Sequence, residues 1–342
     1  MEKKICTIKD IAKELKISAS TVSRALNNHS SIKKETVRLI KALAEKLNYR
    51  PNLMALNLLQ KKTNTIAIVV PEITGHFFST AITAIQDVFN LTQYNVILFL
   101  SNESYKQELD IIDKLGRIQI DGVLVSPSSK TKKFDHFRSL QNSGVPIVVF
   151  DRDCKGFDAD KVLVDDYFGA YQAVEYLIRA GCTRIGHIGG PKDISTSIQR
   201  LNGYLDALKN NNIQIFNEYI EHTSGCNIED GVKSAKKILR LEKTPDAIFT
   251  VNDNIAISVM RTAEKLKFKI PEDILIIGFD DEPHSAYFSP ALSSVWQPIY
   301  DMGMLSARIL LNRLSFEYTS NDFRLEVFKP ELIIRDSSKL IL

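Results

Sequence analysis

The chain has 342 residues, of which 44% are hydrophobic and 25% charged, a composition typical of a globular protein large enough for more than one domain. No run of about 18 apolar residues occurs, and the first residues lack an apolar signal region, so we expect neither a membrane span nor export. The cysteines form no CxxC pair, which predicts reduced thiols, no zinc site and a cytoplasmic location; they are Cys6, Cys154, Cys182 and Cys226.

Charge is divided unevenly along the chain. Residues 1–62 hold 14 Lys or Arg and five Asp or Glu, a charge of +9, whereas the whole chain carries only +3. Residues 63–342 therefore carry −6. A basic segment joined to an acidic body is typical of a module that binds nucleic-acid phosphates and is attached to a domain with another task.

Two short helices with a tight turn are predicted in residues 7–27. Thr7 is placed to cap the first helix, with Asp10 three residues on, and Ser18 is placed to cap the second. Apolar residues fall on one face of each helix: Ile8, Ile11, Ala12 and Leu15 in the first, and Val22, Ala25 and Leu26 in the second. The opposite face of the second helix is small, polar and basic, with Ala19, Ser20, Ser23, Arg24 and Asn27.

This helix-turn-helix spacing predicts a module that enters a groove of double-stranded DNA. Hydroxyl groups, an amide and a guanidinium suit base edges and phosphates. The alternative is an ordinary surface helix in a small helical domain.

A third helix is predicted from the helical spacing of apolar residues between 37 and 47, with Asn48 suited to its end. The segment 52–63 that follows is apolar nearly all round and too short for a stable isolated helix. Two explanations stay open. The segment packs against the following domain, or it becomes helical on DNA and inserts a leucine between base steps of the minor groove.

From Thr65 onward, buried-strand patterns alternate with helical ones. Strands are expected at 66–70, 96–100, 122–125, 146–150, 185–188, 247–251 and 274–279, and helices at 78–90, 105–116, 169–180, 198–210, 231–239 and 255–266. This alternation is typical of parallel sheets covered by helices on both faces. About ten strands are too many for one comfortable sheet, so we expect two doubly wound lobes with a cleft between them.

In open α/β sheets, ligands bind beyond the carboxyl ends of the strands. The segments at those ends combine aromatic rings, carboxylates, an amide and an arginine: residues 71–78, 126–127, 150–152, 189–191, 251–253 and 279–281. Rings stack on sugar faces while Asp, Asn and Arg bind hydroxyl groups, so we expect a polyhydroxylated ligand. Each residue also has a structural alternative, since Asp at a strand end often caps a helix and Gly-Gly-Pro often forms a turn.

Enzymatic signatures are weak. No GxGxxG follows a strand, and neither a phosphate loop nor a GxSxG serine motif occurs. His187 lies mid-strand and is expected in the core rather than as a base. Asp165 and Asp166 could suggest a metal, but we favour a helix cap with a solvated neighbour. We therefore expect no catalytic residue, no metal and no cofactor.

Several motifs together resemble the LacI/GalR family of bacterial transcription repressors over nearly the whole chain. They are residues 7–12, 20–24, 47–51, 77–78, 164–165, 200–204, 251–253, 277–281 and 297–298. The resemblance implies a homodimer with two DNA-binding heads, a hinge helix and a core similar to periplasmic sugar-binding proteins.

The resemblance also implies roles for individual residues. Ala19, Ser20 and Arg24 would read the operator, and Leu58 would insert at its central step. Thr7, Ser18, Thr21 and Ser23 resemble phosphate contacts, and Asn27 and Asn52 join the DNA-binding set. Matching effector positions in the cleft are Thr74, Phe77, Phe78, Ser126, Asp151, Arg152, Arg200, Asn252, Asp280 and Trp296.

The chain departs from the family pattern at three positions. Lys16 replaces the glycine that is frequent in the helix–helix turn, at a cost of about 1 kcal/mol if this residue is left-handed. Leu56 stands where the hinge usually has arginine, which removes a phosphate contact. Ala19 is small, so base discrimination there would rest on methyl contact.

We therefore expect a small all-α helix-turn-helix head and two doubly wound parallel-sheet lobes of periplasmic-binding-protein type. The expected divisions are residues 1–50 for the DNA-binding domain, 51–63 for the hinge and 64–342 for the effector-binding and dimerisation core. The function would be that of a ligand-responsive repressor that binds a pseudo-palindromic operator. We expect the effector to be a sugar, and nucleobases and phosphorylated sugars are the alternatives. A solute-binding transport protein and an α/β enzyme are the rival readings.

Overall fold

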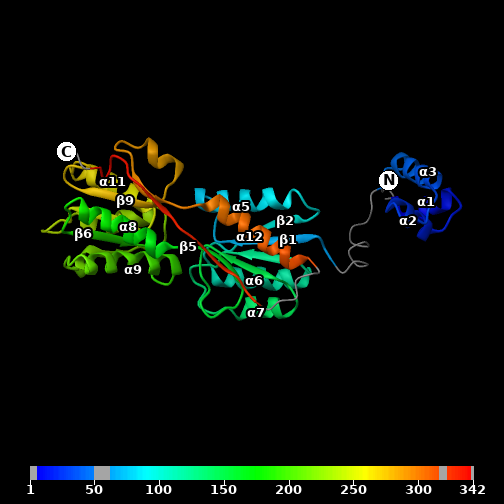
Figure 1. The fold of residues 1–342 in the computed structure, drawn as a ribbon, viewed down its shortest axis with the longest axis horizontal. Coiled ribbons are helices and arrows are strands. Elements are labelled where there is room, and N and C mark those ends of the chain that lie inside the picture. The colour runs from blue at the N-terminus through cyan, green and yellow to red at the C-terminus, as the bar shows by residue number, and fades with distance from the viewer. Residues whose placement is uncertain (1–5, 50–61, 316–321, 340–342) are drawn as a thin grey trace. The chain divides into compact units, whose positions relative to one another are not determined.

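The computed structural model describes residues 6–49, 62–315 and 322–339. The chain divides into two compact units, residues 1–63 and 64–342, here called unit 1 and unit 2 (Figure 1). Asn52, Leu56 and Leu58 lie outside the described residues, so the expectations for the hinge stay predictions.

The described residues 6–49 of unit 1 form three helices, α1 (Ile8–Glu14), α2 (Ala19–Leu26) and α3 (Lys34–Lys46). Both predicted caps are present. The Thr7 backbone N–H and hydroxyl donate to Asp10 Oδ2 over 2.8 and 2.7 Å, and the Thr21 N–H donates to Ser18 Oγ over 3.1 Å. Apolar side chains from all three helices form one small core, which includes Ile11, Ala12, Val22, Ala25, Ile40 and Ala44.

The turn between α1 and α2 contains the predicted departure from the family pattern. Lys16 has φ of 54°, a left-handed conformation in which a side chain costs about 1–2 kcal/mol. Its expected strain is therefore confirmed. Asn48 also has positive φ, at 52°, and follows the end of α3 as an asparagine favours.

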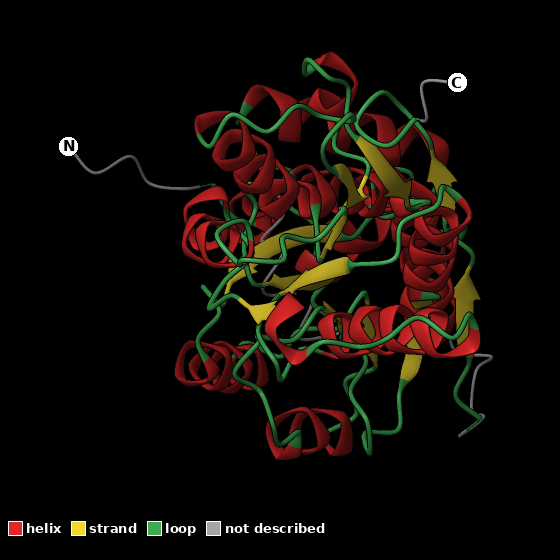
Figure 2. Ribbon diagram, turned by 90° about the vertical axis from the view of Figure 1, so that its left-hand side faces the viewer, coloured by secondary structure: helices red, strands yellow, loops and turns green. Residues whose placement is uncertain are grey.

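Unit 2 holds two six-stranded sheets, ordered β11-β5-β4-β3-β1-β2 and β12-β10-β9-β8-β6-β7, between layers of helices (Figure 2). All pairings are parallel except β10 with β12. The strands are β1 (Thr65–Val70), β2 (Asn95–Leu100), β3 (Gly122–Val125), β4 (Ile147–Phe150), β5 (Asp160–Val164), β6 (Ile185–Gly189), β7 (Ile220–His222), β8 (Ala247–Thr250), β9 (Leu275–Asp280), β10 (Ser293–Trp296), β11 (Leu325–Phe328) and β12 (Glu331–Ile333).

We call lobe 1 the sheet containing β1–β5 and β11 with its helices, and lobe 2 the other sheet with its helices. The helices of lobe 1 are α5 (His76–Phe89), α6 (Tyr105–Arg117), α7 (Asp135–Asn142) and α12 (Ile299–Leu314). Those of lobe 2 are α8 (Asp166–Arg179), α9 (Ser195–Asn210), α10 (Ile228–Ile238), α11 (Asp253–Lys265) and the 3-10 turns η1 (Asn217–Tyr219) and η2 (Pro283–Tyr287).

The chain crosses between the lobes three times, after β5, after β10 and after β11. Because neighbouring central strands in each sheet are parallel, the loops that follow them lie together at one edge of the sheet, next to these crossings. Central strands such as β1, β3, β4 and β8 are buried on both faces, whereas the strands β2, β7, β11 and β12 are partly exposed. This burial explains why the central strands read as continuous apolar runs in the sequence.

Helices α8 and α9 pack closely because Gly203 has no side chain. A Cβ at this position would lie 2.3 Å from the Tyr167 carbonyl oxygen, a backbone atom that cannot turn away. We predict that Gly203→Ala lowers the free energy of unfolding by about 1–3 kcal/mol, measured by urea denaturation of the full chain.

Gly116→Ala is the matched control, because the nearest atom to its Cβ would be a Leu140 side-chain carbon at 3.7 Å. This helical variant should be neutral or slightly more stable, by up to about 1 kcal/mol. Equal destabilisation by both variants would contradict the role of the α8–α9 contact.

Candidate DNA-binding and effector sites

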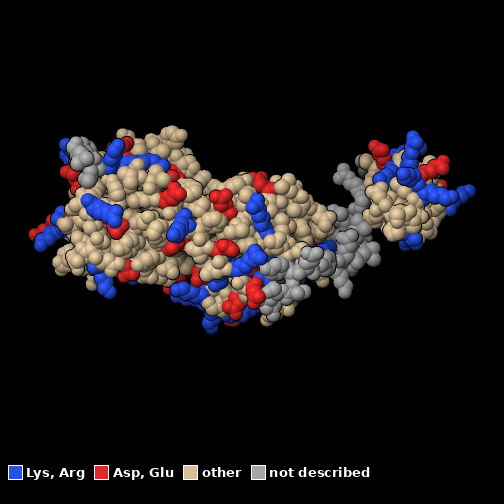
Figure 3. Space-filling model, in the orientation of Figure 1, with Lys and Arg blue, Asp and Glu red and all other residues tan. Residues whose placement is uncertain are grey.

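The outer face of α2 presents the residues expected to meet DNA. Ser18, Ala19, Ser20, Arg24 and Asn27 are exposed, whereas Val22 and Ala25 on the opposite face are fully buried. The Ser18 hydroxyl lies 2.8 Å from the hydroxyls of both Ser20 and Thr21, which orders the start of the helix. Figure 3 shows Lys and Arg side chains on the visible face of unit 1, the electrostatic setting that phosphate binding requires.

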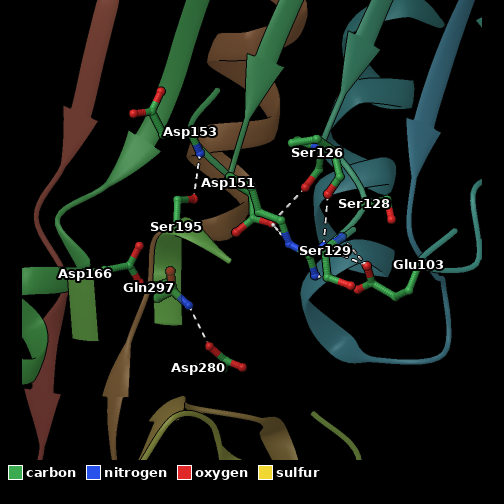
Figure 4. Close-up of polar contacts among 12 residues, drawn as sticks. Glu103, Ser126, Ser128, Ser129, Asp151, Asp153, Asp166, Ser195, Asp280 and Gln297 are labelled. Carbon is green, nitrogen blue, oxygen red and sulfur yellow. Dashed lines mark hydrogen bonds and ion pairs between the residues drawn. The ribbon is translucent and has the colours of Figure 1, made fainter. Parts of the chain in front are cut away.

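In lobe 1 the loops after β2, β3 and β4 form a polar cluster at the carboxyl ends of these strands (Figure 4). The Ser126 hydroxyl donates to Asp151 Oδ2 over 2.9 Å. Arg152 forms a two-pronged ion pair with Glu103, at 3.0 and 2.8 Å, and also donates to the Pro127 carbonyl over 3.0 Å. The Ser129 N–H donates to Glu103 Oε2 over 2.6 Å, so this carboxylate is held on both sides.

In lobe 2 the centre of the site is Arg200 on α9. Its Nε donates to Asp166 Oδ1 over 2.7 Å, and its Nη1 donates to the Val251 carbonyl and to Asp280 Oδ1, the latter over 3.4 Å. The guanidinium lies 3.6 Å from the centre of the Phe279 ring, a cation–π contact. Gln297 then donates to the same oxygen of Asp280 over 2.7 Å.

Two of these carboxylates sit on unusual backbone. Asp151, directly after β4, has φ of 66°, and Asp280, the last residue of β9, has φ of 102°. Such conformations cost about 1–3 kcal/mol and cluster at functional sites, where the surrounding contacts hold them. Ser126 supplies such a contact to Asp151, and Arg200 with Gln297 supplies two to Asp280.

Burial changes the acid–base properties of the site. Burial raises the pKa of Asp151 to about 6, although the Arg152 charge opposes the rise. Burial also raises the pKa of Asp166 and raises that of Asp280 well above its ordinary value, against the charge of Arg200. Burial alone would lower the pKa of both arginines, but the surrounding carboxylates raise it. Burial therefore favours the neutral form of these carboxylates, and the two arginines oppose that effect.

The two lobes touch through a few polar contacts. The Asp153 N–H of lobe 1 donates to Ser195 Oγ of lobe 2 over 2.9 Å, and Lys132 pairs with Asp193 over 3.0 Å. A cavity of about 520 Å³ lies beside these contacts and includes Asp151 and Asp166 in its lining. Trp296, Gln297 and Asp280 line a smaller hollow of about 130 Å³. The larger of the two hollows, about 520 Å³, is lined by residues of both lobes and is open to solvent.

The structure brings together Ser126, Asp151 and Arg152 in lobe 1 and Arg200 with Asp280 in lobe 2. Thr74 is exposed and donates to Glu72, while Phe77 and Phe78 meet edge to face at 5.2 Å. Trp296 is 37% exposed, so its indole is accessible to solvent. Their contact with an effector stays a prediction.

The side chain of Asn252, predicted to contact the effector, already forms hydrogen bonds within the protein. Its Oδ1 accepts from the Ile255 N–H at the start of α11, and its Nδ2 donates to the Cys226 carbonyl, each within about 3.1 Å. The amide is therefore engaged on both sides by protein groups, and its assignment as an effector contact stays untested.

One expectation about the Asp165–Asp166 pair is wrong. Asp165 does cap α8, since its Oδ1 accepts from the Phe168 N–H over 2.9 Å. Its neighbour Asp166, however, is buried and paired with Arg200 rather than solvated. Local sequence cannot show this, because the partner lies 34 residues away.

The expectation for His187 is confirmed. This side chain is fully buried between the rings of Tyr204 and Phe249, and its Nδ1 lies 3.1 Å from the Phe249 carbonyl. Burial lowers its pKa to about 3, which leaves the imidazole neutral. Within residues 6–49, 62–315 and 322–339, no group of His, Cys, Asp and Glu could hold a metal ion.

Besides Asp166, two residues of the site were not predicted from the sequence, Glu103 and Gln297. Glu103 follows β2 as the other candidates follow their strands, so its position at a strand end was a usable signal. Gln297 stood in the Gln-Pro motif, but nothing local indicated its bond to Asp280.

Comparison with known proteins decides the family. Residues 7–52 match the description "Bacterial regulatory proteins, lacI family" and residues 174–338 match "Periplasmic binding protein-like domain". The HTH-type transcriptional repressor PurR of Vibrio vulnificus (strain CMCP6) is 32% identical over 338 residues, which cover 98% of this chain and 100% of that protein. This chain belongs to the LacI family.

Two solved structures support the LacI-family fold. A transcriptional regulator CelR–cellobiose complex matches with a TM-score of 0.74 at 25% identity, covering 97% of this chain and 99% of that chain. A Lac repressor dimer bound to operator and an anti-inducer matches with a TM-score of 0.86 at 21% identity, covering 98% and 100%. The resemblance, the fold class and the function of a ligand-responsive LacI-family transcriptional regulator are therefore confirmed.

Arg24 provides a test of the DNA-reading face. If its guanidinium contacts a base, Arg24→Ala should weaken operator binding by about 1–3 kcal/mol and relax base preference at one position. The measurement is a gel-shift titration of the full chain on a fragment selected from genomic DNA, with an unrelated fragment alongside.

Arg38→Ala on the exposed side of α3 is the control, since it removes the same charge from another helix. A phosphate contact at Arg24 would instead weaken binding to all sequences equally and reduce the salt slope by about 1. That outcome, or an unchanged midpoint, would remove Arg24 from the residues that read bases.

Proposed function

We propose that this chain is a homodimeric repressor whose affinity for a pseudo-palindromic operator is set by a small polyhydroxylated molecule, a sugar or sugar derivative, bound between the two lobes. The single observation that carries the proposal is the buried polar cluster around Arg200, Asp166 and Asp280, placed at the carboxyl ends of strands where α/β lobes bind ligands. The CelR relative with cellobiose in its title supports the choice of a sugar.

The proposal assigns the ten predicted cleft residues to effector contact and the α2 face to operator contact. It also assigns residues 1–50 to the DNA-binding domain, 51–63 to the hinge and 64–342 to the core. The +9 charge of residues 1–62 supports DNA binding by the N-terminal part. Among the described residues, no helix is both long enough and apolar enough to cross a membrane.

Regulation requires two states of the lobes with different effector affinity. The start of unit 2 is tied to lobe 1, because the Asn64 N–H donates to Asp121 Oδ2 and the Asn95 N–H donates to the Asn64 carbonyl, both over 2.7 Å. A movement of lobe 1 therefore moves the point at which the chain leaves for the head. In a dimer this changes the spacing of two such points and so the fit to two half-sites.

The size of the effect follows from linkage. An effector that changes operator affinity about 100-fold corresponds to about 2.7 kcal/mol of coupling free energy. The lobes are joined by polar contacts such as the Asp153–Ser195 hydrogen bond and the partly exposed Lys132–Asp193 ion pair. A coupling free energy of this size is enough to break such contacts and form others.

Arg200→Ala tests the proposal. We expect the variant to keep operator binding and to lose at least about 10-fold of the effector response, because Asp166 and Asp280 would lose their common partner. The measurement is operator affinity with and without a ligand found by thermal-shift screening of the wild-type chain against sugars and nucleosides.

Arg179→Ala is the matched control, because this arginine lies exposed on α8 and pairs with Glu175 one turn away. Arg200→Lys keeps the charge but not the planar fork, and should respond partially. A normal response in Arg200→Ala, with folding verified by circular dichroism, would contradict the assignment of the cleft.

A further inference from the structure

Carboxylates outnumber cations in the cleft. Glu103, Asp151, Asp166 and Asp280 face two guanidiniums, those of Arg152 and Arg200. With every group ionised, this cluster would carry a charge of −2, a value reached only at a pH above the pKa values that burial raises at Asp151, Asp166 and Asp280. An anionic ligand would meet repulsion from the ionised carboxylates, whereas a cationic ligand would lower the negative charge.

The guanidiniums have little capacity left for an anion. Arg152 directs both terminal nitrogens at Glu103 and one of them also at the Pro127 carbonyl. Arg200 donates through Nε to Asp166, and through Nη1 to Asp280 and the Val251 carbonyl. Among the described residues no acceptor is recorded for Arg200 Nη2, so this nitrogen is open to a ligand hydroxyl oxygen.

Acceptor oxygens, by contrast, are in surplus. Within the described part of the chain, no protein group donates to Asp151 Oδ1, Asp166 Oδ2 or Asp280 Oδ2, because every recorded bond uses the other oxygen of each carboxylate. Asp151 and Asp166 line the cavity of about 520 Å³, whereas Asp280 lines the hollow of about 130 Å³. Three open acceptors call for a ligand with several donors.

In the lining of the adjoining cavity of about 520 Å³, carboxylates also outnumber cationic side chains. Its lining contains two lysines, of which Lys132 is already paired with Asp193, and Lys155 is exposed at the surface. The same lining holds five carboxylates, those of Asp151, Asp153, Asp165, Asp166 and Asp193.

We propose that the effector of this chain carries a protonated amine on a polyhydroxylated frame, as an amino sugar does, rather than a phosphate or carboxylate group. The inference rests on the proposed function and narrows its ligand class. An ammonium group donates three charge-assisted hydrogen bonds, and the open oxygens of the cleft carboxylates can accept them while the ring hydroxyls meet Arg200 Nη2.

The experiment compares matched sugars on the full-length protein. Glucosamine, galactosamine and mannosamine are each titrated beside the neutral parent sugar and the 6-phosphate of that parent. The single tryptophan of the chain, Trp296, is 37% exposed beside the cleft and reports binding by its fluorescence. Operator affinity is measured in parallel for every sugar that binds.

We expect the amine of one series to bind at least about 10-fold tighter than its neutral parent, with no binding of the phosphate. Asp280→Asn should remove this preference, whereas Asp135→Asn, which neutralises an exposed carboxylate on α7, should keep it. If Asp280→Asn does not fold, Asp151→Asn, which removes another of the four carboxylates, serves instead.

The pH dependence gives a second readout. Asp151 faces Ser126, Arg152, Asp166 and Arg200, and burial raises its pKa to about 6. Amine affinity should therefore rise up to about 10-fold between about pH 5 and pH 7 as this carboxylate loses its proton, while the affinity of a neutral sugar should stay flat.

The outcomes separate this inference from the function on which it rests. A neutral sugar or sugar phosphate that binds as tightly as the amine and shifts operator affinity overturns the amine proposal and leaves the proposed function standing. Failure of every series to bind also overturns the amine proposal. A sugar that binds at Trp296 without changing operator affinity contradicts the proposed function itself.

Discussion

The bonds of Arg200 are the constraint on which the rest of the cleft depends. One guanidinium joins the crossing segment at Asp166, the end of β8 at Val251 and the end of β9 at Asp280, and it lies flat against Phe279. We call this set of contacts around Arg200 the junction. It extends through Asp280 to Gln297, which lies on the second crossing between the lobes. Removing a partner from such a buried pair leaves an uncompensated charge, which typically costs about 3–5 kcal/mol. The junction therefore holds strand ends and crossings in one arrangement.

That arrangement explains how a ligand in the cleft could affect DNA. The crossings are the covalent links between lobes, and two of them carry residues of the junction, Asp166 and Gln297. A ligand that engages the open carboxylate oxygens changes the charge balance of the junction. The lobes otherwise meet through a few polar contacts, such as those of Asp153 and Lys132. Stable contacts around Arg200 combined with weak contacts between the lobes would allow the lobes to adopt two arrangements, which ligand-dependent regulation requires.

Much of the fold was predictable from local pattern. Apolar strands, helical periodicity and the caps at Thr7 and Ser18 are local signals, and each appears in the structure where expected. The predicted burial of the strand at 96–100 is wrong, because β2 is partly exposed. Helices α7 and α12 and strands β5, β7, β10, β11 and β12 were not predicted. These strands are three to five residues long, too short to establish a clear periodicity. The candidate site was only partly predictable. Residue types at strand ends indicated Asp280, and the family resemblance indicated Arg200. The partners Asp166, Glu103 and Gln297 depend on contacts between distant segments.

The most direct test of the central claim is a double-mutant cycle between Arg200 and Asp280 in the full-length chain. The free energy of unfolding of the larger unit is measured by urea denaturation for the wild type, Arg200→Ala, Asp280→Ala and the double variant. If the guanidinium–carboxylate contact organises the cleft, the coupling energy should be about 1–3 kcal/mol. A coupling energy near zero, with both single variants folded, would show that the two side chains act independently and would contradict the account.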